Sequence, residues 1–293
     1  MTTPHKRFSI GKFLFLVAVQ FTLLLLGLSL LFPKTWAAQI DAGLGSFVLV
    51  FLGAHLFNCF FEWAFHRYVL HVAIAPWLRT FAVDHTHHHD LTNISLIRNK
   101  ANTGRIILNA YPIEKEEQFE SSAFPWYALV GFWLVFTTPF IGLQLLLPHA
   151  PILLGGYAAL TFSMISYEVF HAIEHYPYEW WQRAIEHPHF GSIWRNVYAF
   201  HHFHHYNRKT NEAISGFFGL PVADVVFRTF SLPKNLLLDG RIATVEEFEV
   251  QPPRWIVRWM DKRARALVRF WENRKNRQQT KTERLSREQK QEV

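Results

Sequence analysis

Residues 201–205 read His-His-Phe-His-His, with histidine at the first, fourth and fifth positions. A similar run upstream, residues 85–89, reads His-Thr-His-His-His and has the same spacing. On a helix, positions i, i+3 and i+4 lie on one face. We therefore expect each run to form a helix that directs three imidazoles toward one point.

Two further histidine pairs accompany these runs. His171 and His175 are four residues apart and share a helical face, whereas His66 and His71 are five apart, about 140° around an ideal helix. The helix must therefore end or distort between His66 and His71. The four groups contain ten of the 17 histidines of the chain, and these are the candidate metal ligands: His66, His71, His85, His88, His89, His171, His175, His201, His204 and His205.

Neutral imidazole is a common protein ligand for zinc, iron and copper. Ten imidazoles are too many for one ion, whereas two five- or six-coordinate ions would keep about one open position each, which is typical of catalytic sites. Cys59 is the single cysteine, which excludes an intramolecular disulfide and a cysteine-based zinc or iron–sulfur site. The sequence thus predicts a di-metal centre with nitrogen ligands.

Several carboxylates lie near these histidines in the sequence. Glu62 and Glu168 come one helical turn before histidines of the two pairs, and Asp84 and Asp90 flank the upstream run. Each could accept a hydrogen bond from the second ring nitrogen of a ligand and fix its orientation, or could simply be solvated. We take Glu62, Asp84 and Glu168 as the candidates for this orienting role.

The remaining histidines are weaker candidates. His87 and His202 point away from the shared face of their runs, and His187 or His189, in a proline-containing turn, could replace one of the ten ligands. We treat the others as incidental: His5, His55 and His149.

Four long apolar runs are each sufficient to cross a bilayer as a helix. They cover residues 13–32, 46–71, 124–147 and 152–171, with loops at 33–45 and 148–151. The first run could be a cleaved signal peptide, but it is long for one and no small-residue cleavage site follows it closely. We therefore expect an all-α integral membrane protein with about four transmembrane helices and a helical cap that carries the histidine site.

The distribution of Lys and Arg predicts the orientation. These residues are frequent before the first run, between the second and third, and after the fourth, while the other two loops hold only Lys34. By the positive-inside rule, both termini and the middle segment are cytoplasmic. All four histidine groups then fall at the cytoplasmic face of a bacterial inner membrane or of the endoplasmic reticulum.

Charge divides the chain into segments. Residues 251–293 contain 13 Lys and Arg and 5 Asp and Glu, so this tail has a net charge of +8. The whole chain has a net charge of +7, so residues 1–250 have a net charge of −1. Within this tail, residues 254–271 form a basic amphipathic pattern that suits either a membrane surface or packing on the body, and residues 273–293 read as disordered. We expect an N-terminal segment (1–45), a catalytic domain (46–252) and this tail (253–293), without a nucleic-acid partner.

Residues 72–123 are mostly polar, and 114–122 read as an acidic surface helix.

The histidine motifs resemble the fatty acid hydroxylase superfamily, the sterol-desaturase-like integral membrane oxygenases. The resemblance covers about residues 45–235. It is carried by the segment 66–71, the run at 85–89, Glu168 to His171 with His175, the run at 201–205 followed by Tyr206 and Asn207, and the closing motif 224–229. In that motif Phe-Arg-Thr stands where the family has Phe-Gly-Thr.

The resemblance implies a centre of two iron ions, dioxygen as the oxidant and a lipid-like substrate from the bilayer. Sterols, fatty acyl chains and carotenoids all occur as substrates in the family, and hydroxylation and desaturation use the same ligands. Zinc is possible on purification, because it competes with ferrous iron for nitrogen ligands. The chain has no GxGxxG motif and no cytochrome b5 His-Pro-Gly-Gly sequence, so the electrons would come from a separate donor such as a ferredoxin, or cytochrome b5 with its reductase.

Two other function classes remain open. A zinc-dependent membrane hydrolase would usually carry an HExxH-like general base, which this sequence lacks. A metal transporter would place its ligands near the middle of the bilayer, whereas these lie at the ends of the apolar runs.

Oxidation of an unactivated C–H bond needs a redox metal because no side chain is a strong enough base.

Overall fold

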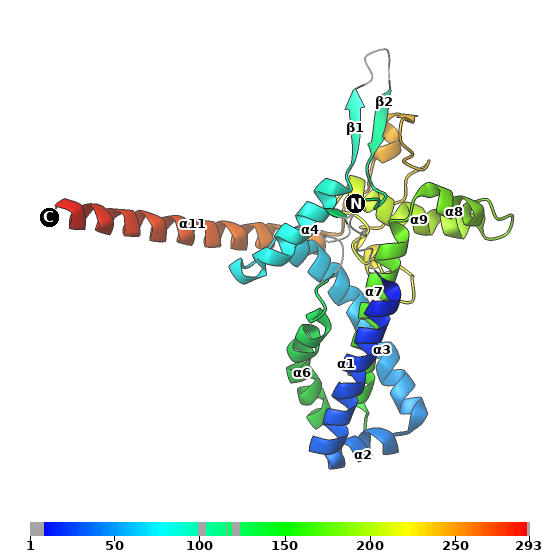
Figure 1. Cartoon of the computed structure of the whole chain (residues 1–293), viewed down its shortest axis with the longest axis vertical. Coiled ribbons are helices and arrows are strands. Elements are labelled where there is room, and N and C mark those ends of the chain that lie inside the picture. The colour runs from blue at the N-terminus through cyan, green and yellow to red at the C-terminus, as the bar shows by residue number, and fades with distance from the viewer. Residues whose placement is uncertain (1–8, 99–103, 116, 119–123, 292–293) are drawn as a thin grey trace, which may run out of the picture.

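The computed structural model describes residues 9–98, 104–115, 117–118 and 124–291, and the chain is mostly helical (Figure 1). The helices are α1 (Ile10–Leu31), α2 (Pro33–Asp41), α3 (Gly43–Phe65), the π-helix η1 (His66–Leu70), the 3-10 helix η2 (Pro76–Leu78), α4 (Arg79–Leu91), α6 (Ala128–Leu146), α7 (Ile152–Glu174), α8 (Tyr178–Ile185), α9 (Gly191–Tyr206), α10 (Val222–Phe227), the 3-10 helix η3 (Val245–Phe248) and α11 (Trp255–Gln291).

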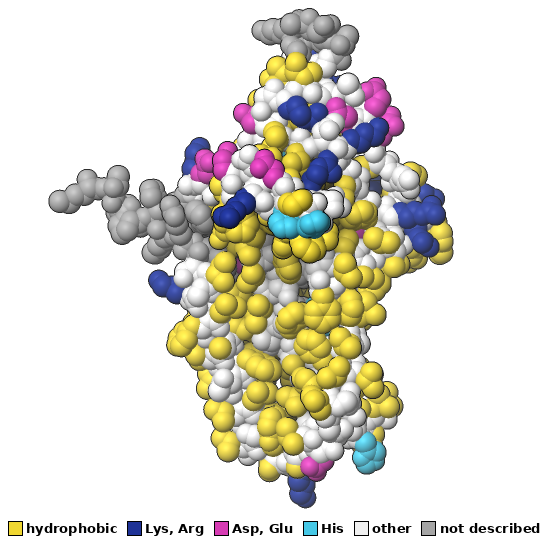
Figure 2. Space-filling model, turned by 90° about the vertical axis from the view of Figure 1, so that its right-hand side faces the viewer, with side chains coloured by type: hydrophobic (Ala, Val, Ile, Leu, Met, Phe, Trp, Pro, Cys, Tyr) yellow, Lys and Arg dark blue, Asp and Glu magenta, His cyan; other side chains and the backbone are white. Residues whose placement is uncertain are grey.

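Four helices are long and apolar enough to cross a membrane: α1, α3 with η1, α6 and α7. On the face that Figure 2 shows, hydrophobic side chains cover most of the lower half, and charged side chains gather mainly above it. A band of this kind matches the hydrocarbon core of a bilayer. The prediction of a helical membrane protein with about four spans is confirmed to this extent.

Helix α7 is the most buried of the four and packs against the other three. Two glycines allow this close approach. A Cβ atom added at Gly155 would lie 2.6 Å from Cγ1 of Val50 on α3, and one at Gly156 would lie 2.8 Å from the ring of Phe140 on α6. Small residues of this kind let membrane helices pack closely.

The segment 33–45, predicted as a loop, contains helix α2. Pro33 stands at its first position, where the missing N–H costs nothing. The side chain of Gln39 then joins α2 to the start of α7, because its Oε1 accepts hydrogen bonds from the backbone amides of Leu153 and Leu154, both at 3.1 Å. These amides are orphan donors at a helix start, which explains why the connection is ordered.

The predicted distortion between His66 and His71 is confirmed. The chain forms the π-helix η1 there, and the amide of His71 donates to the carbonyl of His66 at 3.1 Å. A π-turn bonds residue i to i+5, so residues five apart come to lie above one another. The two imidazoles are stacked, with ring centroids 4.9 Å apart and planes at 15°.

A small cap lies above the bundle and includes α4, α9 and an antiparallel sheet (Figure 1). The strands are β1 (Ile94–Arg98), β2 (Arg105–Asn109) and β3 (Ile242–Ala243), in the order β1-β2-β3. The all-α prediction missed this sheet because its strands are short, and β1 and β2 lie in the segment 72–123 that was read only as polar. The predicted acidic helix at 114–122 lies largely outside the described residues.

Helix α11 is longer than predicted and runs crosswise to the spans (Figure 1). It continues through residues 273–291, where we expected disorder. This segment contains neither glycine nor proline and is rich in Arg, Lys, Gln and Glu, all good helix formers. Val257 and Ala264 are buried in a cluster with Trp63 and Ala223, so one side of α11 packs on the body.

Candidate metal centre

The ten candidate ligands form two compact groups of five. Within each group, one nitrogen from every ring lies within 4.8 Å of the others. Site 1 comprises His66, His71, His85, His89 and His204, and site 2 comprises His88, His171, His175, His201 and His205. All are buried except His71, which is half-buried. Each group could therefore hold a metal ion.

The prediction that each five-residue run directs three imidazoles to one point is wrong. His85 and His89 belong to site 1, whereas His88 belongs to site 2. The run at 201–205 divides in the opposite sense, with His204 alone in site 1. Positions i and i+4 lie about 40° apart on a helix, but i+3 and i+4 lie about 100° apart, so the i+3 ring leans toward the neighbouring centre.

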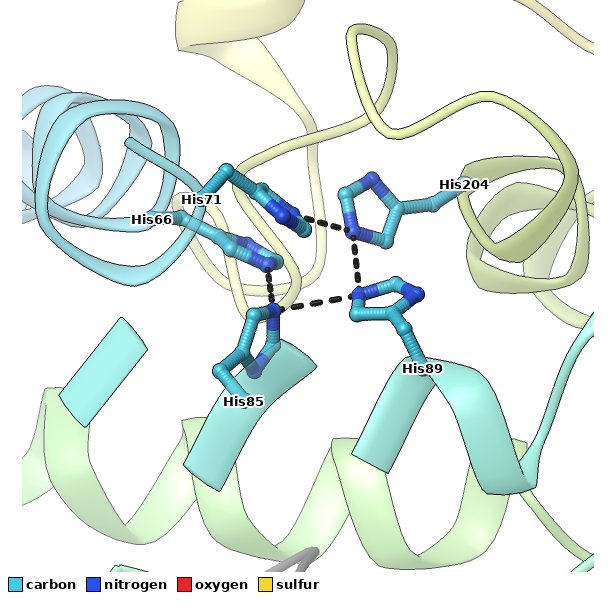
Figure 3. Close-up of side chains that lie close together, drawn as sticks. All are labelled: His66, His71, His85, His89 and His204. Carbon is cyan, nitrogen blue, oxygen red and sulfur yellow. Dashed lines mark hydrogen bonds between the residues drawn. The ribbon is translucent and has the colours of Figure 1, made fainter. Parts of the chain in front are cut away.

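Site 1 lies where η1, α4 and α9 meet, and its ring nitrogens face inward (Figure 3). Nε2 of His85 is 2.9 Å from Nε2 of His66 and 3.1 Å from that of His89. Nε2 of His204 is 3.1 Å from that of His71 and 3.2 Å from that of His89. The five side chains thus surround one point.

Site 2 is built in the same way from α4, α7 and α9, with His175 at the end of α7. Nε2 of His201 lies 3.2 Å from that of His175 and 3.1 Å from that of His205. Nε2 of His171 lies 3.2 Å from that of His88. The stacked rings of His89 and His205, 4.1 Å apart, connect the two sites.

Backbone carbonyls fix the rings of site 1. Nδ1 of His66 is 2.6 Å from the carbonyl oxygen of Glu212, and Nδ1 of His204 is 2.7 Å from that of Thr210. A carbonyl oxygen only accepts, so Nδ1 carries the proton in both rings and Nε2 is left with a lone pair. Both lone pairs point into the site, which is the donor arrangement of a metal centre.

Backbone carbonyls also hold two rings of site 2, and here the two rings face a common neighbour. Nδ1 of His175 donates to the carbonyl of Tyr111 at 2.9 Å, and Nδ1 of His205 to that of Thr92 at 3.0 Å. Both Nε2 lone pairs therefore face Nε2 of His201. That atom carries at most one proton, so at least one of the two contacts brings lone pairs together. A bound cation would remove this repulsion, and the donor set therefore fits a metal.

The cap histidines are held neutral. Burial, followed by the influence of neighbouring histidines, lowers the pKa of His88, His89, His201 and His205 well below the usual value. A neutral ring is the form that binds a metal. The site is thus prepared for binding at neutral pH without first losing protons.

The proposed orienting role of Glu62 does not agree with the contacts. Its two carboxylate oxygens accept from the backbone amide and the hydroxyl of Ser215, at 2.8 and 2.6 Å, while the carbonyl of Glu212 holds His66. Glu168 accepts from the backbone amide of Phe124 at 2.9 Å. These carboxylates therefore join loops to the spans, and their hydrogen bonds go to loop residues instead of to ligand rings.

The acidic residues flanking the upstream run lie at the surface. Asp84 is exposed, and Asp90 pairs with Arg208 at 2.9 Å. Asp84 is therefore solvated, which is the second of the two roles considered for it. Orientation comes instead from backbone carbonyls, which sequence reasoning missed, because every residue carries one.

The other histidines that the structure describes fall outside both groups, and His5 lies outside the described residues. His87 is exposed, and His187 and His189 lie exposed in a turn, so neither of the latter replaces a ligand. His202 is fully buried beside site 2, where its Nε2 accepts from Nδ2 of Asn109 at 2.9 Å and burial lowers its pKa to about 3. His55, treated as incidental, is also buried and hydrogen-bonded.

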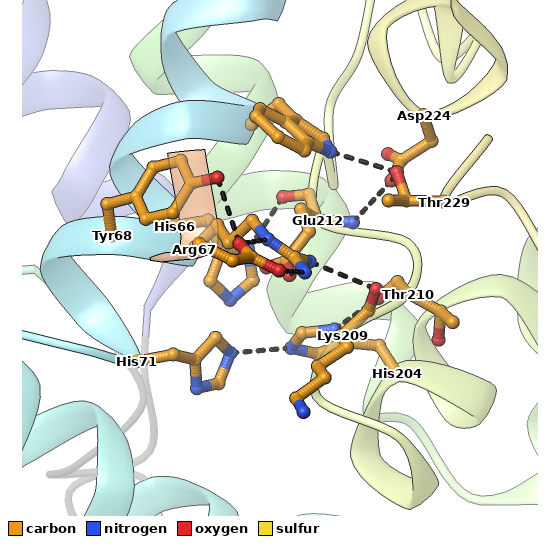
Figure 4. Close-up of polar contacts among 12 residues, drawn as sticks. His66, Arg67, Tyr68, His71, His204, Lys209, Thr210, Glu212, Asp224 and Thr229 are labelled. Carbon is orange, nitrogen blue, oxygen red and sulfur yellow. Dashed lines mark hydrogen bonds and ion pairs between the residues drawn. The ribbon is translucent and has the colours of Figure 1, made fainter. Parts of the chain in front are cut away.

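A buried ionic network supports the loop that holds His66 (Figure 4). Arg67 donates to the Glu212 side chain and to the carbonyl of Lys209, at 2.9 and 3.0 Å. Its other nitrogens form two bonds to Asp261 of α11, both 2.9 Å. A two-pronged pair of this kind is geometrically specific, so it connects α11, η1 and the loop at the edge of site 1.

The closing motif at 224–229 supports the same loop. Asp224 accepts from the backbone amides of Glu212 and Ala213 at 3.0 and 2.8 Å, and from the hydroxyl of Thr229 at 2.6 Å (Figure 4). Arg228 adopts a left-handed conformation, φ 57° and ψ 41°, which glycine tolerates best. A glycine at position 228 would therefore adopt this backbone conformation without strain.

An apolar groove within the spans extends to site 1. It lies between α3, α6 and α7, and His66 and Glu62 lie on its wall. Its apolar walls include Phe61, Phe65, Phe132, Leu160 and Met164. A narrow, largely apolar space of this kind suits a hydrocarbon ligand.

Comparisons with known proteins found no match: no family model, no curated protein and no solved structure corresponds to the chain. The arrangement of the described residues therefore carries the functional argument.

Proposed function

We propose that the protein is an O2-dependent di-iron oxygenase that hydroxylates or desaturates a lipid-like substrate at the cytoplasmic membrane face. The observation that carries the proposal is the pair of buried five-histidine sites at the end of the spans. The adjoining apolar groove supports a substrate that arrives from the bilayer.

Site 1 would hold one iron ion through its five histidines, and site 2 would hold a second iron ion in the same way. Bound iron would supply the reduction of dioxygen that oxidises an unactivated C–H bond. Five protein ligands keep one position of a six-coordinate ion open. The chain contributes the neutral rings, their orientation by the carbonyls of Glu212, Thr210, Tyr111 and Thr92, and an adjoining apolar groove for the substrate.

The electron source in this proposal is a separate protein, a ferredoxin or a cytochrome b5 with its reductase. With both termini and the two sites in the cytoplasm, as the positive-inside rule predicts, the sites would lie on the side where such a donor is available. The membrane would be a bacterial inner membrane or the endoplasmic reticulum.

The experiment compares two adjacent residues of one run. Full-length protein in lipid nanodiscs is loaded with ferrous iron without oxygen, then given dioxygen, a lipid extract and a donor with its reductase. We expect an oxygen-dependent product that has gained one oxygen or lost two hydrogens. His88→Ala removes a ligand of site 2 and should abolish this product. His87 is the exposed neighbour, so His87→Ala should leave product formation unchanged.

The alternatives give different results in the same preparation. A zinc-dependent hydrolase would release product without oxygen. A transporter would move metal across vesicles and lose that movement in His88→Ala. Either result, without an oxygen-dependent product, contradicts the proposal.

A further inference from the structure

Three polar side chains, two of them buried and one half-buried, lie together inside the spans on α3 and α7. They are His55, Asn58 and Ser163, and the last two line the apolar groove. Nδ2 of Asn58 and Nδ1 of His55 are each 3.0 Å from the Ser163 hydroxyl. Polar groups at this depth need partners because the hydrocarbon core offers no water.

The protons of this cluster can be assigned from its surroundings. Nε2 of His55 accepts from the backbone amide of Phe218 at 3.2 Å, so the proton of His55 is on Nδ1, which donates to Ser163. The Ser163 hydroxyl itself donates to the carbonyl of Ala159 at 2.8 Å. Its oxygen can therefore only accept from Asn58.

This assignment fixes the orientation of the Asn58 amide. Its nitrogen faces Ser163, so its carbonyl oxygen, Oδ1, faces elsewhere. Among the residues that the structure describes, Oδ1 has no hydrogen-bond partner, although Asn58 is only 4% exposed and lines the groove. In apolar surroundings a polar group without a partner is costly, so this acceptor on the groove wall selects for a ligand that donates a hydrogen bond.

The position of Asn58 relative to site 1 adds a length. Asn58 precedes His66 by eight residues on the same helical segment, which is about 12 Å of rise. Phe61 and Phe65 line the wall between them. A ligand bound at Asn58 could therefore extend along this apolar wall to His66.

We propose that the groove binds a lipid alcohol whose hydroxyl donates to Oδ1 of Asn58. The chain of this lipid lies along α3, and a carbon about 12 Å from the hydroxyl reaches site 1. That this carbon is the one oxidised rests on the proposed function. The hydroxyl contact itself does not, because it depends only on the groove and its polar cluster.

The test measures binding without turnover. Full-length, metal-free protein in nanodiscs is labelled with a photoreactive long-chain alcohol or with the same chain lacking the hydroxyl. We expect the alcohol to label the groove about tenfold more efficiently, the effect of one net hydrogen bond. The wild-type protein alone gives this comparison, and excess unlabelled alcohol should compete better than the matched alkane.

Variants then assign the preference to Asn58. Asn58→Leu removes the acceptor and should lower alcohol labelling to the level of the hydrocarbon probe, which should itself be unchanged. Asn58→Asp keeps an acceptor and should restore the preference. Ser29→Leu removes a polar group of α1 that bonds its own helix, and should leave labelling by both probes unaltered.

The outcomes separate the two proposals. Equal labelling by the two probes in the wild type means that Asn58 accepts from water only and overturns the inference, even if lipid oxidation is observed. A preference that survives in Asn58→Leu also overturns it. An alcohol preference that depends on Asn58, in a protein without oxygenase activity, supports the binding site and contradicts the proposed function.

Discussion

At the residue scale, the identity of the ligands could be read from the sequence but their partition could not. Spacings of three, four and five residues identified all ten histidines that the structure brings together. The assignment of His88 to one site and His89 to the other depends on where neighbouring helices lie. The carbonyls that hold the rings were also unpredictable, because any residue can supply one.

The left-handed conformation of Arg228 leads to a prediction at this scale. A residue with a Cβ atom pays about 1–2 kcal/mol in this region, and Phe227 and Thr229 fix the turn around it. Arg228→Gly should therefore be neutral or stabilise the protein by up to about 1 kcal/mol, measured as thermal unfolding in detergent. Arg228→Val, whose β-branch fits poorly there, should lower the unfolding temperature. Clear destabilisation by glycine would contradict the account.

At the element scale, hydropathy predicted the four spans, and the five-residue spacing predicted the distortion at η1. The sheet was missed because its strands are short. Helix α2 and the second half of α11 were missed because polar composition alone does not separate an ordered surface helix from a loop or a disordered tail. Contacts far apart in sequence, such as Gln39 with Leu153, decide these cases.

The π-helix is expected to be necessary for site 1. Inserting one alanine after Val69 would add a residue between His66 and His71 and turn His71 by about 100° relative to His66. We expect the metal content to fall by about half, with the ligands of site 2 still in place. Val69→Ala keeps the length of η1 and serves as the control. Full metal content in the insertion variant would show that the five-residue spacing of η1 is dispensable.

Helix α11 is expected to rest on the membrane surface. Trp255, Trp259 and Phe270 are exposed and fall within about 60° of one another around the helix. Such an aromatic stripe on a basic helix suits an anionic bilayer. A spin label at Ala266→Cys, on the stripe, should be accessible to oxygen in anionic nanodiscs, whereas one at Arg265→Cys should contact water-soluble reagents. Equal access to water at both positions would contradict this placement.

At the scale of the whole molecule, the spans, cap and α11 converge on the histidine sites. Helix α7 supplies ligands to site 2, and η1 supplies them to site 1, while α4 and α9 each supply both. Arg67 joins η1 to α11 and to the loop of Glu212. The sequence predicted this convergence through the placement of histidines at the ends of apolar runs, but the groove beside site 1 depends on packing among three spans.

The most direct test is the metal content of protein purified without oxygen, chelators or added metal. The two five-histidine groups predict two ions per chain, iron in the native protein. His204→Ala and His201→Ala, which affect different sites, should each remove about one ion and together remove both, while the exposed His187→Ala should remove none. A wild-type protein without tightly bound metal would contradict the account, as would a wild-type protein with a single ion that either variant alone removes completely.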